Sequence, residues 1–342
     1  MVRAFKASCL PVILWLGLGF GLVRADVVFH LNPMSGMDSA AVAGFTAAAQ
    51  LWSNVLSNNM TVNLDIGFTS LGGGILGQTE LTESQFSYRN YRNALAGRAT
   101  SASDALAVAS LTTNDSFNLL INGTTNNASP HVVSNDLVSM TSANAKALGL
   151  VGAANTATDA TITFNSDFNF EFNPPSVTGS SRFDFVGVAA HEIGHALGFI
   201  SSVDALDTNL NAFDDSHWNG SVTPLDTFRM STRVSDGTID WTADTQAKYL
   251  SLDHGATSLG AFATGAMHGD GSQASHWKEQ TPRLGIMNPT AAPGERLAIS
   301  DRDKLALDVI GYQIVPEPSS VILLGVGGVL VAVGMRKRAT CR

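Results

Sequence analysis

Residues 183–199 read FDFVGVAAHEIGHALGF, and this stretch decides the fold prediction. Its continuous apolar character predicts a buried helix that begins at 183–185 and ends at Gly198, because glycine adopts the left-handed conformation that stops a helix. Residues four apart share one helix face, so His191 and His195 can offer two imidazole nitrogens to one ion. The sequence therefore predicts a zinc-binding helix.

Glu192 lies one residue further round this helix from His191. It is poorly placed to be a third ligand but can reach a water bound to the metal. Zinc lowers the pKa of that water, and Glu192 would accept its proton as general base while a carbonyl carbon is attacked. The alternative is a core helix with two hydrogen-bonded histidines, but the chain has only eight histidines and the HExxH spacing rarely arises by chance.

A catalytic zinc site needs a third protein ligand. The extended form of the motif would place a histidine at position 201, but this chain has Ser201 there. We favour His276, because SHWKEQTPRLGIMNP (275–289) combines it with Met287 in a turn-like setting. The full set of candidates left open by the residues themselves is His217, His254, His268, His276 and acidic residues such as Asp204.

HEIGHALGF, followed after a long insertion by SHWKEQTPRLGIMNP, resembles the leishmanolysin-like branch of the metzincins; the matching segments are mainly 183–199 and 271–312. The resemblance implies His276 as third ligand and Met287 packed beneath the metal. It also implies an α+β zincin fold with an active-site helix, a mixed sheet with an edge strand, and an irregular inserted subdomain at about 200–275.

The remaining elements follow from periodicity. VVFHL at 27–31 and MTVNLDIGF at 60–68 predict strands on either side of a helix at Ser39 to Leu56, which indicates an α/β-type layer. TITFNSDFNFEF at Thr161 to Phe172 alternates with period two, and we expect it to be an edge strand that pairs with an extended substrate. Further helices are expected at 101–111, at 143–148 and, with a capping-box variant, from Ser300 to Gly311.

Composition excludes several classes of protein. The chain has 342 residues, of which 44% are hydrophobic and 14% charged, so it can bury one large core or two modest ones. Its net charge of -9 argues against nucleic acid as a partner. Its two cysteines, Cys9 and Cys341, lie near the ends, so neither a disulfide nor a thiolate is expected within the domain at 26–314.

The first 25 residues have the features of an export signal. Arg3 and Lys6 form a basic start, an apolar run extends from Leu10 to Val23, and Ala25 is a small residue at a plausible cleavage position. A retained membrane anchor is the alternative, but the run is short for a spanning helix. We expect the mature chain to begin near Asp26.

The last segment, 315–342, contains VPEPSSVILLGVGGVLVAVGMRKR and resembles the PEP-CTERM sorting signal. It combines a Pro-Glu-Pro turn, an apolar segment at 321–335 and a basic end at 336–338. The resemblance implies transient anchoring in the inner membrane, removal by an exosortase-type processing enzyme, and a secreted or surface location. A permanent anchor is the alternative. The segments TPLDTFR (223–229) and ISDRDKLALDVIGY (299–312) also resemble PEP-CTERM-associated metalloproteases.

The leading hypothesis is an exported zinc-dependent endopeptidase that acts on proteins or peptides. One rival is a non-catalytic zinc-binding protein of the extracellular matrix or cell surface, which would have no use for Glu192. Another is a zinc hydrolase of a different amide or ester. Asp214 and Asp215 offer oxygen ligands for calcium, although a solvated loop is the simpler interpretation.

Overall fold

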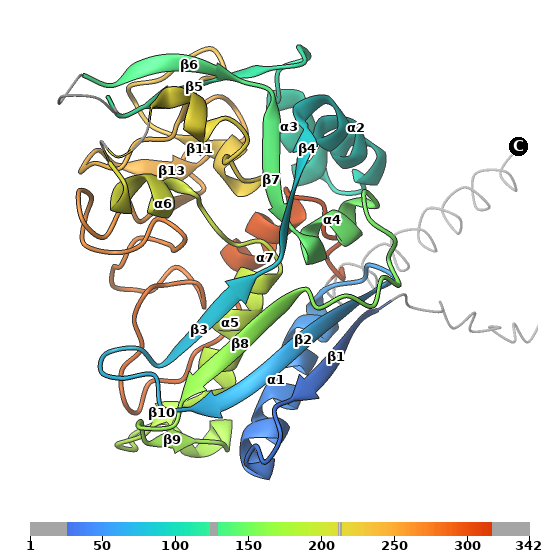
Figure 1. Cartoon of the computed structure of the whole chain (residues 1–342), viewed down its shortest axis with the longest axis vertical. Coiled ribbons are helices and arrows are strands. Elements are labelled where there is room, and N and C mark those ends of the chain that lie inside the picture. Colours follow the sequence, from blue (N-terminus) through green and yellow to red (C-terminus); the bar gives the residue numbers. More distant parts are fainter. Residues whose placement is uncertain (1–25, 124–128, 211, 213, 317–342) are drawn as a thin grey trace, which may run out of the picture.

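A four-stranded mixed sheet supports the half of the molecule that carries His191 (Figure 1). The computed structural model describes residues 26–123, 129–210, 212 and 214–316. Three strands are parallel, and the fourth, β3, runs antiparallel to β8 at one edge. In spatial order the strands are β1 (Val27–Pro33), β2 (Met60–Thr69), β8 (Ala160–Asn165) and β3 (Gly77–Leu81).

The expected edge strand at Thr161 to Phe172 is wrong in two respects, because a turn at 166–168 ends the strand early and because the strand does not lie at the edge. Residues 160–165 form β8, which is paired on both sides, by β2 and by β3. Period-two alternation of apolar and polar residues indicates that one face of a strand is buried and the other is not. It does not indicate whether the strand backbone is hydrogen-bonded to one neighbouring strand or to two. The strand at the free edge is β3 instead.

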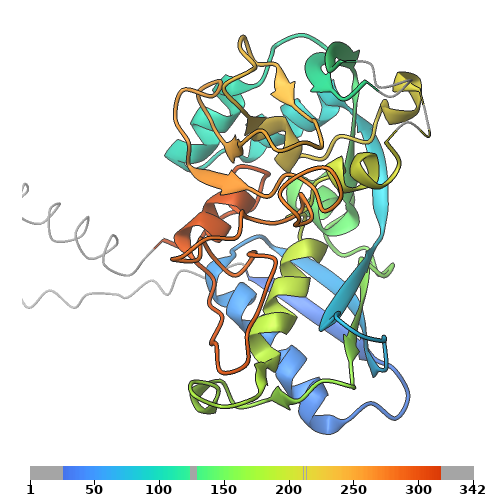
Figure 2. The same cartoon turned by 90° about the vertical axis from the view of Figure 1, so that its left-hand side faces the viewer.

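Two long helices, α1 (Ser39–Val55) and α5 (Phe185–Ala196), cover one face of this sheet (Figures 1 and 2). They approach closely, because a Cβ at Gly44 of α1 would lie 2.4 Å from the Phe185 ring. Trp52 of α1 donates a hydrogen bond from Nε1 to the Ala190 carbonyl of α5 at 2.7 Å. The helix that carries the HExxH motif is therefore packed beside α1 and against the sheet.

The other half of the molecule is built from shorter elements. A β4–β7 ladder leads from the large sheet into it, and three helices pack nearby (Figure 1). These elements are β4 (Glu83–Ser87), α2 (Tyr88–Arg98), α3 (Ala102–Ser110), β5 (Phe117–Ile121), β6 (His131–Asn135), β7 (Leu137–Thr141) and α4 (Ser142–Leu148). The final helix, α7 (Asp301–Asp308), lies between the two halves.

The long insertion after α5 is irregular, and it also joins the rest of the fold. Its strand β12 pairs in parallel with β5, so it completes a sheet begun much earlier in the chain. The inserted elements are α6 (Val203–Thr208), 3-10 turns at Asp215–Trp218 and Leu225–Phe228, β11 (Arg229–Met230), β12 (Ile239–Asp240), β13 (Lys248–Leu250) and β14 (Gly260–Phe262). Before α5 lie β9 (Phe170–Glu171), a 3-10 turn (Pro174–Ser176) and β10 (Phe183–Asp184).

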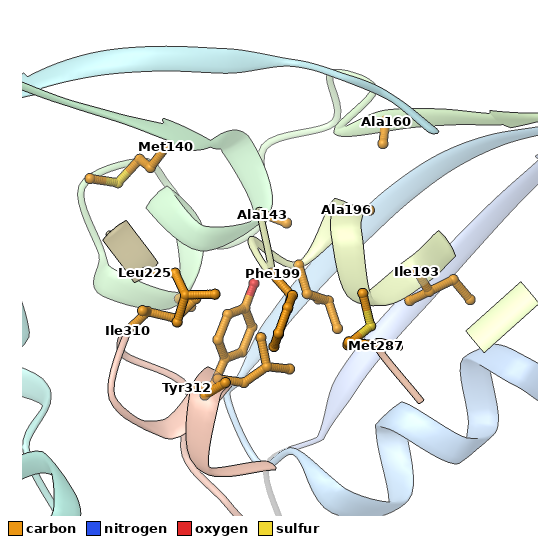
Figure 3. Packing of buried hydrophobic residues seen from close by; sticks show 14 of the residues in the cluster. Met140, Ala143, Ala160, Ile193, Ala196, Phe199, Leu225, Met287, Ile310 and Tyr312 are labelled. Atoms are coloured by element: carbon orange, nitrogen blue, oxygen red, sulfur yellow. The ribbon is translucent and has the colours of Figure 1, made fainter. Parts of the chain in front are cut away.

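One continuous core links the two halves. Phe199, just after α5, packs with Ile310 and Tyr312, which follow α7 (Figure 3). Both ends of the described chain are held by α1: Ser53 donates to the Val27 carbonyl at 2.7 Å, and the Val315 N–H donates to the Val55 carbonyl at 2.9 Å. Burial of this shared core ties the position of α5 to that of α7.

Candidate metal centre

The α5 helix begins and ends where its sequence dictates. The Asp184 carboxylate accepts the Gly187 N–H at 3.0 Å and caps the first turn, which satisfies a donor that the helix itself leaves unpaired. At the other end Gly198 has φ +109°, a conformation that a side chain would strain. Between these points His191 and His195 lie one turn apart on the same face.

Three histidines meet at one point in the structure. Nε2 of His191 lies 3.1 Å from Nε2 of His195 and 3.3 Å from Nε2 of His276. Among the residues that the structure describes, these three form the only group of at least three potential ligands with its atoms within 4.8 Å of one another. His276 therefore reaches the motif helix from across the inserted region, as expected of the third ligand.

The outer nitrogens of these rings all face backbone carbonyls. Nδ1 of His191 lies 2.8 Å from the Ile286 oxygen, and Nδ1 of His195 lies 2.8 Å from the Phe199 oxygen. Nδ1 of His276 lies 3.2 Å from the Gln273 oxygen. A carbonyl only accepts, so each Nδ1 carries the proton in a neutral ring and each Nε2 presents a bare lone pair.

Burial keeps two of the rings neutral. It holds the pKa of His195 well below its usual value, and the neighbouring His191 and His276 lower it further. Burial followed by the proximity of His191 lowers the pKa of His276 to about 3, although the Gln273 carbonyl opposes that shift. Neutral imidazole is the form that ligates a metal.

Three lone pairs that converge at this spacing repel one another unless a cation lies between them. Nitrogens bonded to a tetrahedral zinc at about 2.0–2.1 Å lie about 3.3–3.4 Å from each other. The observed separations of 3.1 and 3.3 Å fit that requirement. Three imidazoles with carbonyl-anchored Nδ1 atoms are a donor set that suits zinc, and a tetrahedral ion held by them would have one position left for a water or substrate.

Glu192 lies in the same cleft, held by the edge strand β3. Thr79 of β3 donates a hydrogen bond from Oγ1 to Glu192 Oε2 at 2.7 Å. Glu192 is 6% exposed, and burial raises the pKa of its carboxyl, whereas the proximity of His191 and the Thr79 hydrogen bond lower it. Sequence reasoning identified Glu192 but not Thr79, whose short strand gives no periodic signal.

Met287 packs behind the centre. Its sulfur occupies the space beside Gly194, where an added Cβ would lie only 2.4 Å away. Figure 3 shows Met287 against the turn of α5 that bears Ile193 and Ala196. It is fully buried. Met287 therefore packs against the helix that carries His191 and His195, and its place beneath a metal stays a prediction.

The Met287 turn is held by Asp303 of α7, which sequence analysis treated only as part of a helix cap. The Asp303 carboxylate accepts the N–H of Ile286 at 2.8 Å and that of Met287 at 3.3 Å. It also accepts the Trp277 indole N–H at 2.8 Å and the Ser300 N–H at 2.7 Å. A single buried carboxylate thus fixes the carbonyl that orients His191 and the residue that follows His276.

The other sequence candidates are engaged elsewhere. His268 bonds to Asp207, and His254 adopts a positive φ in a turn. The remaining ones are Asp204, which accepts hydrogen bonds from Ala274 and Ser275, and His217, which lies in the 3-10 turn at Asp215–Trp218. Asp214 caps that turn and Asp215 pairs with His131, so these acids fit the interpretation as a solvated loop.

The three histidines and Glu192 open onto a cleft of about 700 Å³. One wall is β3, which contributes Gly77, Gln78 and Thr79. Apolar side chains gather elsewhere in the lining, namely Ile75, Leu76, Phe168, Phe183, Val188 and Leu297. Because β3 is the last strand of its sheet, the cleft has, beside the three histidines, a strand edge that can accept a further strand.

Comparison with known proteins adds one finding about the tail. Residues 315–338 carry a PEP-CTERM protein-sorting motif. The motif marks a chain for export to the cell envelope or surface and for recognition by an exosortase-type processing enzyme. No curated protein and no solved structure matches the chain.

The expected membrane segments cannot be compared with the fold. The signal at 1–25, the apolar stretch at 321–335 and the basic end at 336–338 lie outside the described residues. Within the part of the chain that is described, every helix is too short or too polar to cross a bilayer.

Proposed function

We propose that this chain is an exported zinc-dependent endopeptidase of metzincin-like type. In this proposal His191, His195 and His276 hold the metal and Glu192 is the general base. The observation that carries it is the convergence of three bare Nε2 atoms at 3.1 and 3.3 Å beside a buried carboxylate in an open cleft. A structural zinc site closes its shell with four protein ligands and needs no base.

The chemistry divides between metal and protein. When bound, zinc lowers the pKa of a coordinated water toward neutrality and polarises a substrate carbonyl. Glu192 accepts a proton in the cleft and delivers it to the leaving amine. Thr79 orients this carboxylate by its hydrogen bond to Oε2, which leaves Oε1 for the proton. Burial raises the pKa of the Glu192 carboxyl, which makes its carboxylate a stronger base than an exposed one.

The cleft suits an extended peptide. A substrate that pairs with β3 would use the backbone groups of Gly77 to Leu81 on the side away from β8. Thr79 sits on this strand, so pairing places a substrate amide close to Glu192 and the three histidines. An edge strand next to the base favours peptides over small esters or amides.

The sorting motif sets the location of this activity. We infer that the tail anchors the exported chain in the inner membrane until an exosortase-type enzyme cleaves it, and that the catalytic domain then acts outside the cytoplasm. Mass spectrometry of the exported protein should show a C-terminus near residue 316. An intact tail on all exported molecules would refute processing.

The test of function compares the exported protein with its Glu192→Gln variant. Both should contain one zinc per chain, because Glu192 is not a ligand, and only the parent should cleave unfolded casein. Loss of the base should lower turnover at least about 100-fold. Zinc in both proteins without cleavage would favour the non-catalytic zinc-binding alternative, and absence of zinc from the parent would remove the basis of the proposal.

A further inference from the structure

The third histidine is carried by a segment that has no regular structure of its own. Residues 273–276 belong to no helix or strand, and isolated bridges at Ser272 and Trp277 flank them. His276 is nevertheless 7% exposed and points at the other two histidines. Contacts from outside the segment must therefore hold it in place.

Asp204 supplies the closest of these contacts. Its carboxylate accepts the Ala274 N–H through Oδ1, and it accepts the Ser275 N–H at 3.1 Å and the Ser275 hydroxyl through Oδ2. Three donors from the two residues directly before His276 thus converge on one side chain. Arg229 adds a weaker contact, from Nη1 to the Ala274 carbonyl at 3.4 Å.

The same contacts connect His276 to the helix that carries the other two ligands. The Phe199 carbonyl accepts from His195, and two residues later the Ser201 N–H donates to Ser275 Oγ at 2.9 Å. Ser275 Oγ in turn donates to Asp204. A short stretch at the end of α5 therefore touches His195 on one side and the His276 segment on the other.

We infer that Asp204 is a positioning residue of the metal centre, which presets His276 for ligation by fixing the backbone of the two residues before it. Without this clamp the segment is free to move, and metal binding must offset the entropy of ordering it. The inference rests on the metal-binding part of the proposed function and is independent of peptidase activity.

The chain provides a matched control in the same helix. Asp207, also in α6 and almost fully buried, accepts the Met267 N–H at 2.7 Å and both the N–H and Nδ1 of His268 at 2.9 Å. It holds the turn at 267–268 through three donors; this turn carries no member of the histidine group, although it leads into the His276 segment through the Gly265–Ser272 bridge. Asp204→Asn and Asp207→Asn thus each alter a carboxylate that accepts three hydrogen bonds, but only Asp204 accepts them from the two residues directly before a proposed ligand.

The experiment is a titration of the exported protein with Zn²⁺ against a competing chelator, together with the visible absorption of bound Co²⁺. Asp204→Asn should weaken zinc affinity by about 10- to 100-fold and alter the Co²⁺ spectrum, as loss of ligand orientation does at other sites. Asp207→Asn should stay within about threefold of the parent. Equal losses in the two variants, or an unchanged affinity in Asp204→Asn, would overturn the inference.

A second variant covers the case in which Asp204→Asn does not fold. Ser275→Ala removes the hydroxyl that joins Ser201 to Asp204 but leaves both backbone donors in place. It should weaken zinc binding by about 3- to 10-fold. Parent-like affinity in this variant would count against the clamp. A parent chain that binds no zinc would instead refute the metal centre itself, which separates the two failures.

Discussion

Replacing Asp303 by asparagine should destabilise the protein severely. The carboxylate accepts four N–H groups, from Trp277, Ile286, Met287 and Ser300, and it has no exposure to water. Asparagine keeps one of the two carboxylate oxygens as an acceptor. Its NH₂ group replaces the second oxygen and faces the two N–H groups that this oxygen accepted. Two buried donors then lose their partner at about 1–3 kcal/mol each, so we expect a loss of about 3–5 kcal/mol.

Urea unfolding of the metal-free protein measures this loss directly. The control is Asp301→Asn, because Asp301 lies in the same first turn of α7 but is almost fully exposed and forms a surface ion pair with Lys304. Asp301 and Asp303 both interact favourably with the dipole of α7, which contributes about 0.3–1 kcal/mol for each, so this contribution is common to the two variants. If the two variants lose equal stability, the hydrogen bonds of Asp303 to the Met287 turn do not stabilise the fold as described.

Two further predictions concern buried acids away from the cleft. Burial raises the pKa of Asp308 to about 6, with a smaller contribution from Asp104 and an opposing hydrogen bond from Ser101. The folded state therefore holds the Asp308 proton more tightly than the unfolded state, and the associated stability is lost as pH rises through 6. In urea unfolding, Asp308→Asn should stabilise the protein by about 1–2 kcal/mol at pH 8 and by less at pH 4.5. A difference between variant and parent that does not change with pH would contradict this prediction. Lys146 and Asp159 form a buried ion pair at 2.6 Å, so Lys146→Met should cost about 3–5 kcal/mol by leaving the carboxylate unpaired. Adding Asp159→Asn removes that charge and keeps a polar partner for Asn63 and Ser142, so it should restore part of the loss; a double variant as unstable as the single would refute this.

Much of the helical structure was predictable because it depends on local spacing. The expected helices at Ser39 to Leu56 and at 143–148 coincide with α1 and α4 to within a residue at each end. The capping box at Ser300 and Asp303 is present, as expected, at the start of α7. Helix α2 (Tyr88–Arg98) was missed, since its polar residues outnumber the buried ones that face the core.

The edge of the sheet was not predictable in the same way. Residues 77–81, GQTEL, have weak strand character and no apolar alternation, yet they form the wall of the cleft. Whether a strand is central or at an edge depends on which backbones pair with it, and side-chain patterns do not record that pairing. The sequence prediction accordingly assigned the edge to β8, which is paired on both sides.

The sequence by itself determined the chemistry of the helix face, because His191, Glu192 and His195 obtain their relative positions from the repeat of a single helix. It also identified His276 and Met287 as candidates, but three other histidines and acidic residues such as Asp204 remained open as the third ligand. Only the tertiary structure brings His276 to within 3.3 Å of His191, and long-range contacts hold the residues beside it: Asp204 bonds to Ala274 and Ser275, and Asp303 bonds to Trp277. Such contacts join residues far apart in the chain, and no local periodicity encodes them.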